Sequence, residues 1–176
     1  MSPKSSVIVR RAAAEDIPSL SAIGSEAFSE AYASFNTAND ISAHIQSQYS
    51  LAAIRQEMES PDRFYLVALL NDAPAGLCKL RAGPVPKDIP DSASLEIQQL
   101  YIGPRYQRHG IGTALVDAVV DEARTWGLNG VWLGVWQEAP WATNFYSKYG
   151  FTRFGVHTFQ LGSAEQTDLL MWIGVN

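Results

Sequence analysis

The segment that most constrains the fold of this chain is QRHGIG, residues 107–112. It stands between an apolar run at 95–102, which predicts a strand, and a helical apolar pattern that begins at Ile111. A strand, a loop with glycines and a helix start gather unpaired backbone N–H groups at the helix N-terminus, where the helix dipole adds positive potential. Glycine lets an anion come close to that backbone. The segment therefore predicts a strand–loop–helix unit that binds a phosphate group.

Two common phosphate-binding loops do not fit these residues. A Walker A loop has Lys and then Ser or Thr directly after its last glycine, but Ile111 follows Gly110 and Thr113 follows Gly112. A dinucleotide fingerprint has a third glycine at the position that Leu115 occupies. A tight strand-to-helix turn without any ligand uses glycines in the same way, so the loop alone leaves the ligand open.

Composition and charge limit the class of protein. With 176 residues, 47% of them hydrophobic, we expect a single domain over 1–176 with a well-formed core. The net charge of −5 argues against nucleic acid as the main partner. Cys78 is the only cysteine, which excludes an intrachain disulfide, and no apolar run is long enough to span a membrane. We therefore expect a cytoplasmic protein with neither a nucleic-acid nor a membrane partner.

The apolar patterns predict an order of elements that mixes hairpins with crossover helices. Strands are predicted at 7–11, 64–70, 75–81, 95–102 and 131–135, with a final pair from 151 to about 173. Helices are predicted from about 14 onward, over 40–59 in one or two pieces, over 111–126 and over 140–149. This order indicates an α/β fold, either α+β or a layered mixed sheet.

A second motif, NFYSKYGF at 144–151, follows the predicted strand at 131–135. The two motifs, in this order and spacing, resemble those of the GCN5-related N-acetyltransferase (GNAT) superfamily. That superfamily pairs a Q/R-x-x-G-x-G/A loop after its fourth strand with F-Y-x-K-x-G-F on the helix after its fifth. Segments 95–97, 132–136 and 165–169 look like the PaiA-type spermidine/spermine N-acetyltransferases in particular. The resemblance implies the acyl-CoA N-acyltransferase fold: a mostly antiparallel central sheet, splayed between strands 4 and 5 and flanked by helices.

The resemblance also implies that the phosphate belongs to acetyl-CoA, whose pyrophosphate would bind the loop mainly through backbone N–H groups. The loop residues implied are Gln107, Arg108, His109, Gly110, Ile111, Gly112 and Thr113. Leu100, Tyr101 and Ile102 would contact the pantetheine arm, with one N–H donating to the thioester carbonyl. Asn144 and Lys148 complete the cofactor candidates. The family often has Asn seven residues before its catalytic Tyr; Ala139 stands there, and Asn144 takes that role only as a hypothesis.

Tyr146 and Glu96 are the predicted catalytic residues. Tyr146 occupies the family's general-acid position and would protonate the departing thiolate, although a packed aromatic on an amphipathic helix would look the same. The acceptor needs a base, because a primary amine with a pKa of about 10.4 is almost wholly protonated at neutral pH. Glu96 is the candidate, acting directly or through water, because a carboxylate among apolar strand residues is costly without a role or partner. An outward-facing Glu on an alternating strand remains the alternative.

The resemblance implies that the acceptor amine binds near the first two helices and the final strands. The candidates are Glu30, Tyr32, Phe35 and His157, with Glu26 and Phe159 in the same regions. Carboxylates beside aromatics suit a polyamine through charge pairing and cation–π contact, but a solvated helix face beside core aromatics gives the same pattern.

These observations predict direct acetyl transfer, through a ternary complex, to a small polyamine such as spermidine. A protein or peptide N-acetyltransferase and a non-catalytic CoA-binding regulatory module remain as alternatives. A covalent route through Cys78 is disfavoured, because a lone Cys in a strand is usually a small buried hydrophobe. The scattered histidines predict no metal site, and a homodimer remains an open alternative to a monomer.

Overall fold

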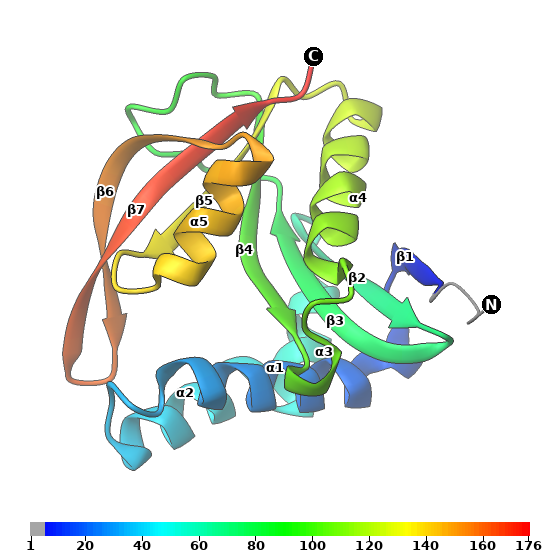
Figure 1. Cartoon of the computed structure of the whole chain (residues 1–176), viewed down its shortest axis with the longest axis vertical. Helices are drawn as coiled ribbons and strands as arrows, with labels where there is room; N and C mark the ends of the chain where they lie inside the picture. Colours follow the sequence, from blue (N-terminus) through cyan, green and yellow to red (C-terminus); the bar gives the residue numbers. More distant parts are fainter. Residues whose placement is uncertain (1–5) are drawn as a thin grey trace.

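Seven strands form one mixed sheet within residues 6–176, which the computed structural model describes except for the side chains of residues 159 and 161 (Figure 1). The strand order is β1-β2-β3-β4-β5-β7-β6. The only parallel pair in this sheet is β4 with β5, and every other described pairing is antiparallel. The strands are β1 (Val7–Arg11), β2 (Arg63–Leu70), β3 (Ala73–Arg81), β4 (Ser94–Ile102), β5 (Gly130–Trp136), β6 (Thr152–Leu161) and β7 (Ala164–Gly174).

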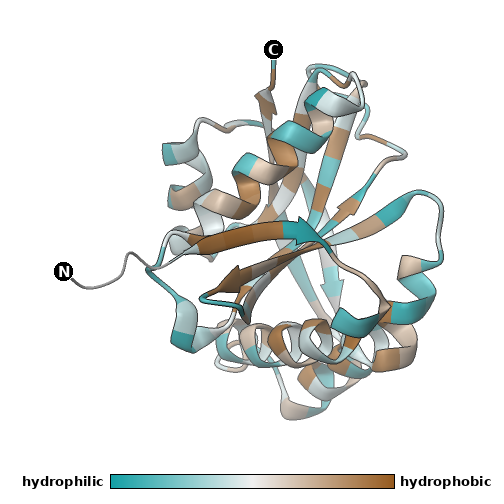
Figure 2. Ribbon diagram, turned by 90° about the vertical axis from the view of Figure 1, so that its right-hand side faces the viewer, coloured by the Kyte–Doolittle hydropathy of each residue, from teal (hydrophilic) through white to brown (hydrophobic). Residues whose placement is uncertain are grey.

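Helices cover both faces of the sheet, as Figures 1 and 2 show. One layer contains α1 (Ile17–Tyr32), α2 (Ala38–Tyr49) and α3 (Leu51–Met58); the other contains α4 (Ile111–Thr125) and α5 (Pro140–Tyr149). Short 3₁₀ turns precede α1 (Ala14–Asp16) and follow β4 (Pro104–Tyr106). The predicted order of elements and the mixed α/β fold are therefore confirmed.

The predicted helix over 40–59 is two helices, and Ser50 is the residue that separates them. Its backbone is extended (φ −62°, ψ 152°), which ends α2, and its side-chain oxygen accepts a hydrogen bond from Ala53 N that caps α3. The hairpin between β2 and β3 is also tighter than the predicted 71–74 loop. Asn71 and Asp72 alone form the turn, both with positive φ (50° and 67°), as a two-residue turn that matches the strand twist requires.

The hydrophobic core lies in two layers, one on each face of the sheet, and Figure 2 shows the apolar strand residues between the helices. The larger cluster joins α4 and α5 to the sheet through residues such as Leu66, Leu95, Leu115, Val119 and Phe151. On the opposite face, one cluster joins α1 and α3 to β2 and β3 through Ile17, Leu20, Ile23, Ile54, Tyr65, Val67 and Leu77, and a smaller one joins α1 to α2 through Phe28, Ile41 and Tyr49. Burial of these side chains fixes both helical layers against the strands.

The sheet splits between β4 and β5, as the resemblance implied. The two strands pair only over 94–97 and 130–133, and they diverge beyond these residues (Figure 1). A bulge coincides with the split, because Leu80 pairs with Ile97 whereas Lys79 pairs with Gln99, which leaves Gln98 as the extra residue of β4. In the described chain, the backbone edge of β4 beyond Ile97 that faces β5 thus has no strand partner.

Candidate active site

A cavity of about 350 Å³ lies where β4 and β5 separate. Residues 97–102 of β4 and 133–136 of β5 line it, together with Gln107 and Gly112. On what we call the α1 side it is lined by Ala27, Ala31, Tyr32, Trp136 and Asp168, and on the α5 side by Ala139, Trp141, Ala142, Phe145 and Tyr146. The split in the sheet therefore joins the two faces of the molecule in one cavity.

The glycine loop leads directly into the N-terminus of α4, as the sequence predicts. Gly110 is the N-cap of α4 with a φ of +78°, and no side chain caps the helix there. Ala114 N donates to Gly110 O at 3.0 Å, so the N–H groups of residues 111–113 precede the first intrahelical hydrogen bond. A Cβ on Gly112 would lie 3.2 Å from Phe145 Cζ and 3.3 Å from Ile102 Cδ1. Gly110 thus allows the left-handed backbone conformation before α4, and Gly112 allows Phe145 and Ile102 to pack closely beside the cavity.

The donor set of the cavity fits the acyl-CoA that the sequence predicts. Leu100, Tyr101 and Ile102 all line it, on the strand edge that has no partner among the described residues. An open strand edge offers backbone groups to an extended, amide-bearing chain such as pantetheine. The free N–H groups and positive dipole end of α4 stand beside Gln107 and suit a pyrophosphate.

The other predicted cofactor residues lie outside the cavity lining. Arg108 and His109 are exposed on the loop, where Arg108 has a φ of +66° and His109 Nδ1 lies 2.9 Å from Gln107 O. Ile111 is buried in the core and Thr113 is exposed, so the backbone N–H is what Ile111 offers a ligand. Asn144 and Lys148 are exposed on α5. Ala139, where the family often has Asn, lines the cavity at the N-cap of α5.

Tyr146 is held rigidly at the cavity by aromatic packing. Its ring lies 5.1 Å from that of Phe145 and 5.5 Å from that of Phe151, both edge-on, and only 8% of the residue is exposed. Burial raises the pKa of its phenol well above the ordinary value, and the thiol of Cys78 and the phenol of Tyr32 add to the increase. The phenol therefore keeps its proton at neutral pH, as a group that must donate one requires.

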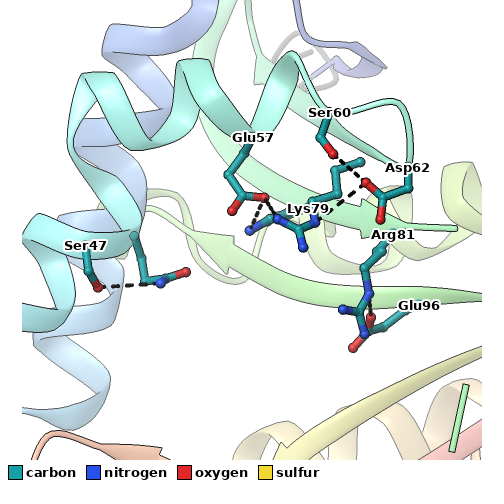
Figure 3. A network of polar contacts seen from close by, with 9 residues as sticks. Ser47, Glu57, Ser60, Asp62, Lys79, Arg81 and Glu96 are labelled. Atoms are coloured by element: carbon teal, nitrogen blue, oxygen red, sulfur yellow. Dashed lines mark hydrogen bonds and ion pairs between the residues drawn. The ribbon is translucent and has the colours of Figure 1, made fainter. Parts of the chain in front are cut away.

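Glu96 lies in an ion pair and not in the cavity lining. Its Oε2 is 2.6 Å from Arg81 Nε, in a contact without hydrogen-bond alignment, and its side chain is 14% exposed. Burial raises the pKa of the Glu96 carboxyl, although Arg81 opposes this. Figure 3 shows this pair next to a second set of contacts, in which Lys79 Nζ lies 2.9 Å from Glu57 Oε2. The partner that a carboxylate among apolar residues needs is thus Arg81 on the neighbouring strand β3, at the end of β4 that still pairs with β5.

Asp168 on β7 is the carboxylate that does line the cavity, and the sequence patterns did not single it out. Leu169 and Met171 pack toward α4 and α5, so Asp168 lies on the opposite, α1 face of the sheet, in register with Trp136. The residue is 8% exposed, and burial raises the pKa of its carboxyl while His157 lowers it. One signal was present: an Asp inside a strand is unusual, and it falls in the 165–169 segment.

Three of the predicted acceptor residues gather around this carboxylate. Tyr32 lines the cavity and its ring lies 5.3 Å from that of Trp136, while Phe35, 56% exposed, packs edge-on against Trp136 at 4.9 Å. His157 Nε2 lies 3.9 Å from Asp168 Oδ2, with 45% of its side chain exposed. The remaining candidates, Glu26 and Glu30, are exposed and outside the lining, and the side chain of Phe159 lies outside the described residues.

Amide oxygens add further acceptors for hydrogen bonds. The Oε1 atoms of Gln98, Gln99 and Gln166 are buried and have no hydrogen-bond partner among the described residues, and Gln98 and Gln99 line the cavity. An unpaired buried acceptor costs free energy that a bound N–H donor would recover. This part of the cavity is therefore suited to a ligand rich in N–H groups.

The described residues contain neither a metal-binding cluster nor a membrane-spanning helix. No group of three or more His, Cys, Asp or Glu side chains among them could hold a metal ion. None of the helices in residues 6–176 has the length and apolarity needed to cross a bilayer. Cys78 is fully buried and burial raises the pKa of its thiol, so that it stays protonated.

Comparisons with known proteins agree with this geometry. A model described as "Acetyltransferase (GNAT) family" matches residues 26–151. A protein named "Uncharacterized N-acetyltransferase in pepI 3'region", from Lactobacillus delbrueckii subsp. lactis, is 30% identical over 89% of this chain and 91% of its own length. The structure of the PaiA N-acetyltransferase from Thermoplasma acidophilum with coenzyme A is similar, with a TM-score of 0.78, 22% identity, and coverage of 96% of this chain and 99% of that one. A ribosomal-protein alanine N-acetyltransferase from Escherichia coli has a TM-score of 0.70 at 16% identity, with coverage of 97% and 95%.

Proposed function

This chain belongs to the GNAT family of acetyltransferases and uses acetyl-CoA, and from that premise we propose that it acetylates a primary amine of a small polyamine such as spermidine. The observation that carries the proposal is the shared cavity. On its α5 side it contains the acid Tyr146, and on its α1 side it contains the carboxylate of Asp168 among aromatic rings. An ammonium group and a thioester would meet where these two sides join.

Each part of the cavity has a task in this reaction. The N–H groups at the start of α4 hold the pyrophosphate, and the free edge of β4 around Leu100 orients the pantetheine arm and offers an N–H to the thioester carbonyl. Bound acetyl-CoA supplies the acetyl group in activated form. Tyr146 donates the proton of its phenol to the departing sulfur, because a thiol with a pKa of about 8.5 leaves more easily when it is protonated.

The chemistry of the α1 side supports a cationic, N–H-rich acceptor. Asp168 supplies negative charge, Tyr32 and Trp136 supply ring faces, and the unpaired oxygens of Gln98 and Gln99 accept hydrogen bonds. A polyamine has both the positive charges and the spare N–H donors that this set would satisfy. The fold alone does not choose the acceptor, because the similar structures include a PaiA enzyme and a ribosomal-protein acetyltransferase.

Release of free CoA thiol from acetyl-CoA tests the proposal. The purified protein is assayed with spermidine, with an aminoglycoside, with an amino acid and with short peptides bearing a free α-amine or a lysine. We expect the highest kcat/KM with spermidine and a mono-acetylated product by mass spectrometry. Acetylation of the peptides alone would show a protein acetyltransferase, and tight CoA binding without thiol release from any amine would show a regulatory module.

A further inference from the structure

Two carboxylates on the α1 face of the sheet, those of Glu96 and Asp168, are candidates for the base that removes a proton from the acceptor ammonium. Glu96 faces the guanidinium of Arg81 at 2.6 Å and does not line the cavity. The positive charge of Arg81 stabilises the ionised form of the Glu96 carboxyl and so opposes burial, which raises its pKa. Glu96 is therefore badly placed for proton transfer from an amine in the cavity, and its Oε2 already faces a cation.

Asp168 differs from Glu96 on both counts. It lines the cavity together with Tyr146 and with the β4 edge at 98–102. Among the described residues, no Arg or Lys forms an ion pair with it, and its nearest basic group is His157 Nε2, at 3.9 Å from Oδ2. A carboxylate that is buried and lacks a fixed cation binds a proton more readily than an exposed one.

We propose that Asp168 is the catalytic base of this enzyme, and that its carboxylate binds the acceptor ammonium from the α1 side and takes its proton. The inference rests on the proposed function, since it needs an amine acceptor. It replaces Glu96 in the role that the sequence predicts for that residue, and assigns Glu96 to the ion pair with Arg81.

The protons balance over one turnover. The N–H bond of the ammonium breaks and its proton goes to Asp168, which leaves a neutral amine with a lone pair. The nitrogen bonds to the acetyl carbon, the carbon–sulfur bond breaks, and the sulfur takes the proton of Tyr146. The second proton that leaves the acetylated nitrogen restores the phenol. The proton on Asp168 then goes to solvent.

The groups that face Asp168 determine the pH at which it acts. They are the phenols of Tyr32 from α1 and Tyr101 from β4, and the imidazole of His157 from β6, while β5 contributes the uncharged Trp136 and Gly134. Burial raises the pKa of both phenols, so they stay neutral, and the positive charge of His157 lowers the pKa of Asp168 against the effect of burial.

The test compares Asp168→Asn with Glu96→Gln, and uses Glu165→Gln, an exposed residue on the same strand, as the matched control. At neutral pH we expect Asp168→Asn to lower kcat/KM for spermidine by about 10² to 10⁴. The rate of this variant should rise with pH toward the amine pKa of about 10.4, where solution supplies the free amine. In the native enzyme, kcat/KM should fall at low pH as the base becomes protonated, and we call this fall the acid limb of the pH profile. Glu96→Gln should keep this acid limb, and Glu165→Gln should keep the native rate.

Two measurements do not depend on turnover of a variant. Calorimetric titration of spermidine into the CoA complex should show about ten- to hundredfold weaker binding for Asp168→Asn, with unchanged CoA binding. With native enzyme, an aromatic amine that is uncharged at neutral pH should show no acid limb due to Asp168, because it has no proton to lose. This second arm shows whether an enzyme base acts on the ammonium even if Asp168→Asn does not fold, and the acid limb of Glu96→Gln with spermidine then shows whether that base is Glu96 or Asp168.

The outcomes separate the two proposals. Native activity on spermidine, with Asp168→Asn retaining the native rate and pH profile, overturns Asp168 as the base and leaves the proposed function intact. Loss of the acid limb in Glu96→Gln overturns it as well and restores Glu96. A native enzyme that acetylates none of the amines overturns both.

Discussion

The carboxylate of Asp168 and the phenol of Tyr146 line one cavity although they belong to opposite faces of the sheet. Asp168 is on the face that α1 covers, and Tyr146 packs into the cluster that α4 and α5 build. Only the split between β4 and β5 lets the two groups reach a common space. An amine that enters from one face and a sulfur that leaves on the other would then have the acetyl carbon between them.

Removal of the Tyr146 hydroxyl should slow acetyl transfer without loss of cofactor binding. For Tyr146→Phe we expect kcat to fall by about 10² to 10⁴, because the thiolate must then leave without a proton donor. Tyr149→Phe is the matched control on the same helix, since its hydroxyl donates to Asp117 Oδ1 at 2.6 Å on the surface. Stopped-flow detection of thiol release measures kcat, and calorimetry measures the affinity for CoA. An unchanged kcat in Tyr146→Phe would remove Tyr146 from the mechanism.

Alanine at the two loop glycines should have different effects. Gly110→Ala places a Cβ on a residue with a φ of +78°, so we expect a loss of about 1 kcal/mol in the free energy of unfolding. Gly112→Ala has an ordinary helical position but a Cβ at 3.2 Å from Phe145 Cζ, which must shift beside the cavity. We therefore expect its main effect on the KM for acetyl-CoA. Urea unfolding and initial rates separate the two, and equal KM values for all three proteins would contradict the packing role of Gly112.

The ion pair between Arg10 and Asp16 should make stability depend on pH. Asp16 accepts two hydrogen bonds from Arg10, at 2.7 and 2.9 Å, and one from Ala13 N at 2.8 Å. The bonds from Arg10 are the main cause that lowers the pKa of Asp16, and burial opposes them. A lowered pKa stabilises the fold above the ordinary value of about 3.9, and this contribution disappears as the pH falls through the lower folded pKa.

For Asp16→Asn we therefore expect a loss of about 1 to 2 kcal/mol at pH 7, moderated by the partly exposed Arg10. The difference from the native protein should narrow in strong acid. Chemical denaturation at several pH values measures this, with Glu15→Gln, an exposed neighbour, as the control. A difference that is constant with pH would show that the ion pair is not the cause.

Loss of the His157 imidazole should shift the acid limb of the activity profile upward. The positive charge of His157 lowers the pKa of Asp168 against the effect of burial. In His157→Gln the carboxyl should therefore need a higher pH to ionise, and the shift should be small because the pair is partly exposed. The kcat/KM profile for spermidine measures the shift, with Thr158→Ala on the same strand as the control. A shift of the acid limb toward lower pH would contradict an electrostatic contact between His157 and Asp168.

The order of the elements was predictable from the sequence, while the lining of the cavity was predictable only in part. Gln107, Gly112, residues 100–102 and Tyr146, which the family resemblance singled out, do lie together at the cavity. Tyr32 and His157 were anticipated and do lie near Asp168, whereas Glu30 points to solvent. The alternation of apolar residues around Glu96 was too irregular to show which face it occupies, because the bulge at Gln98 interrupts the strand.

The sequence by itself determined the order of the helices and strands, the glycine loop before a helix and the family, because periodicity, glycine positions and motif spacing are properties of short segments. The tertiary structure decided which carboxylate lines the cavity and which one lies in an ion pair. Arg81 pairs with Glu96 through the register of β3 and β4, and Asp168 reaches the cavity through its register with Trp136 of β5. These contacts join residues that lie far apart along the chain, and the pairing of strands brings them together.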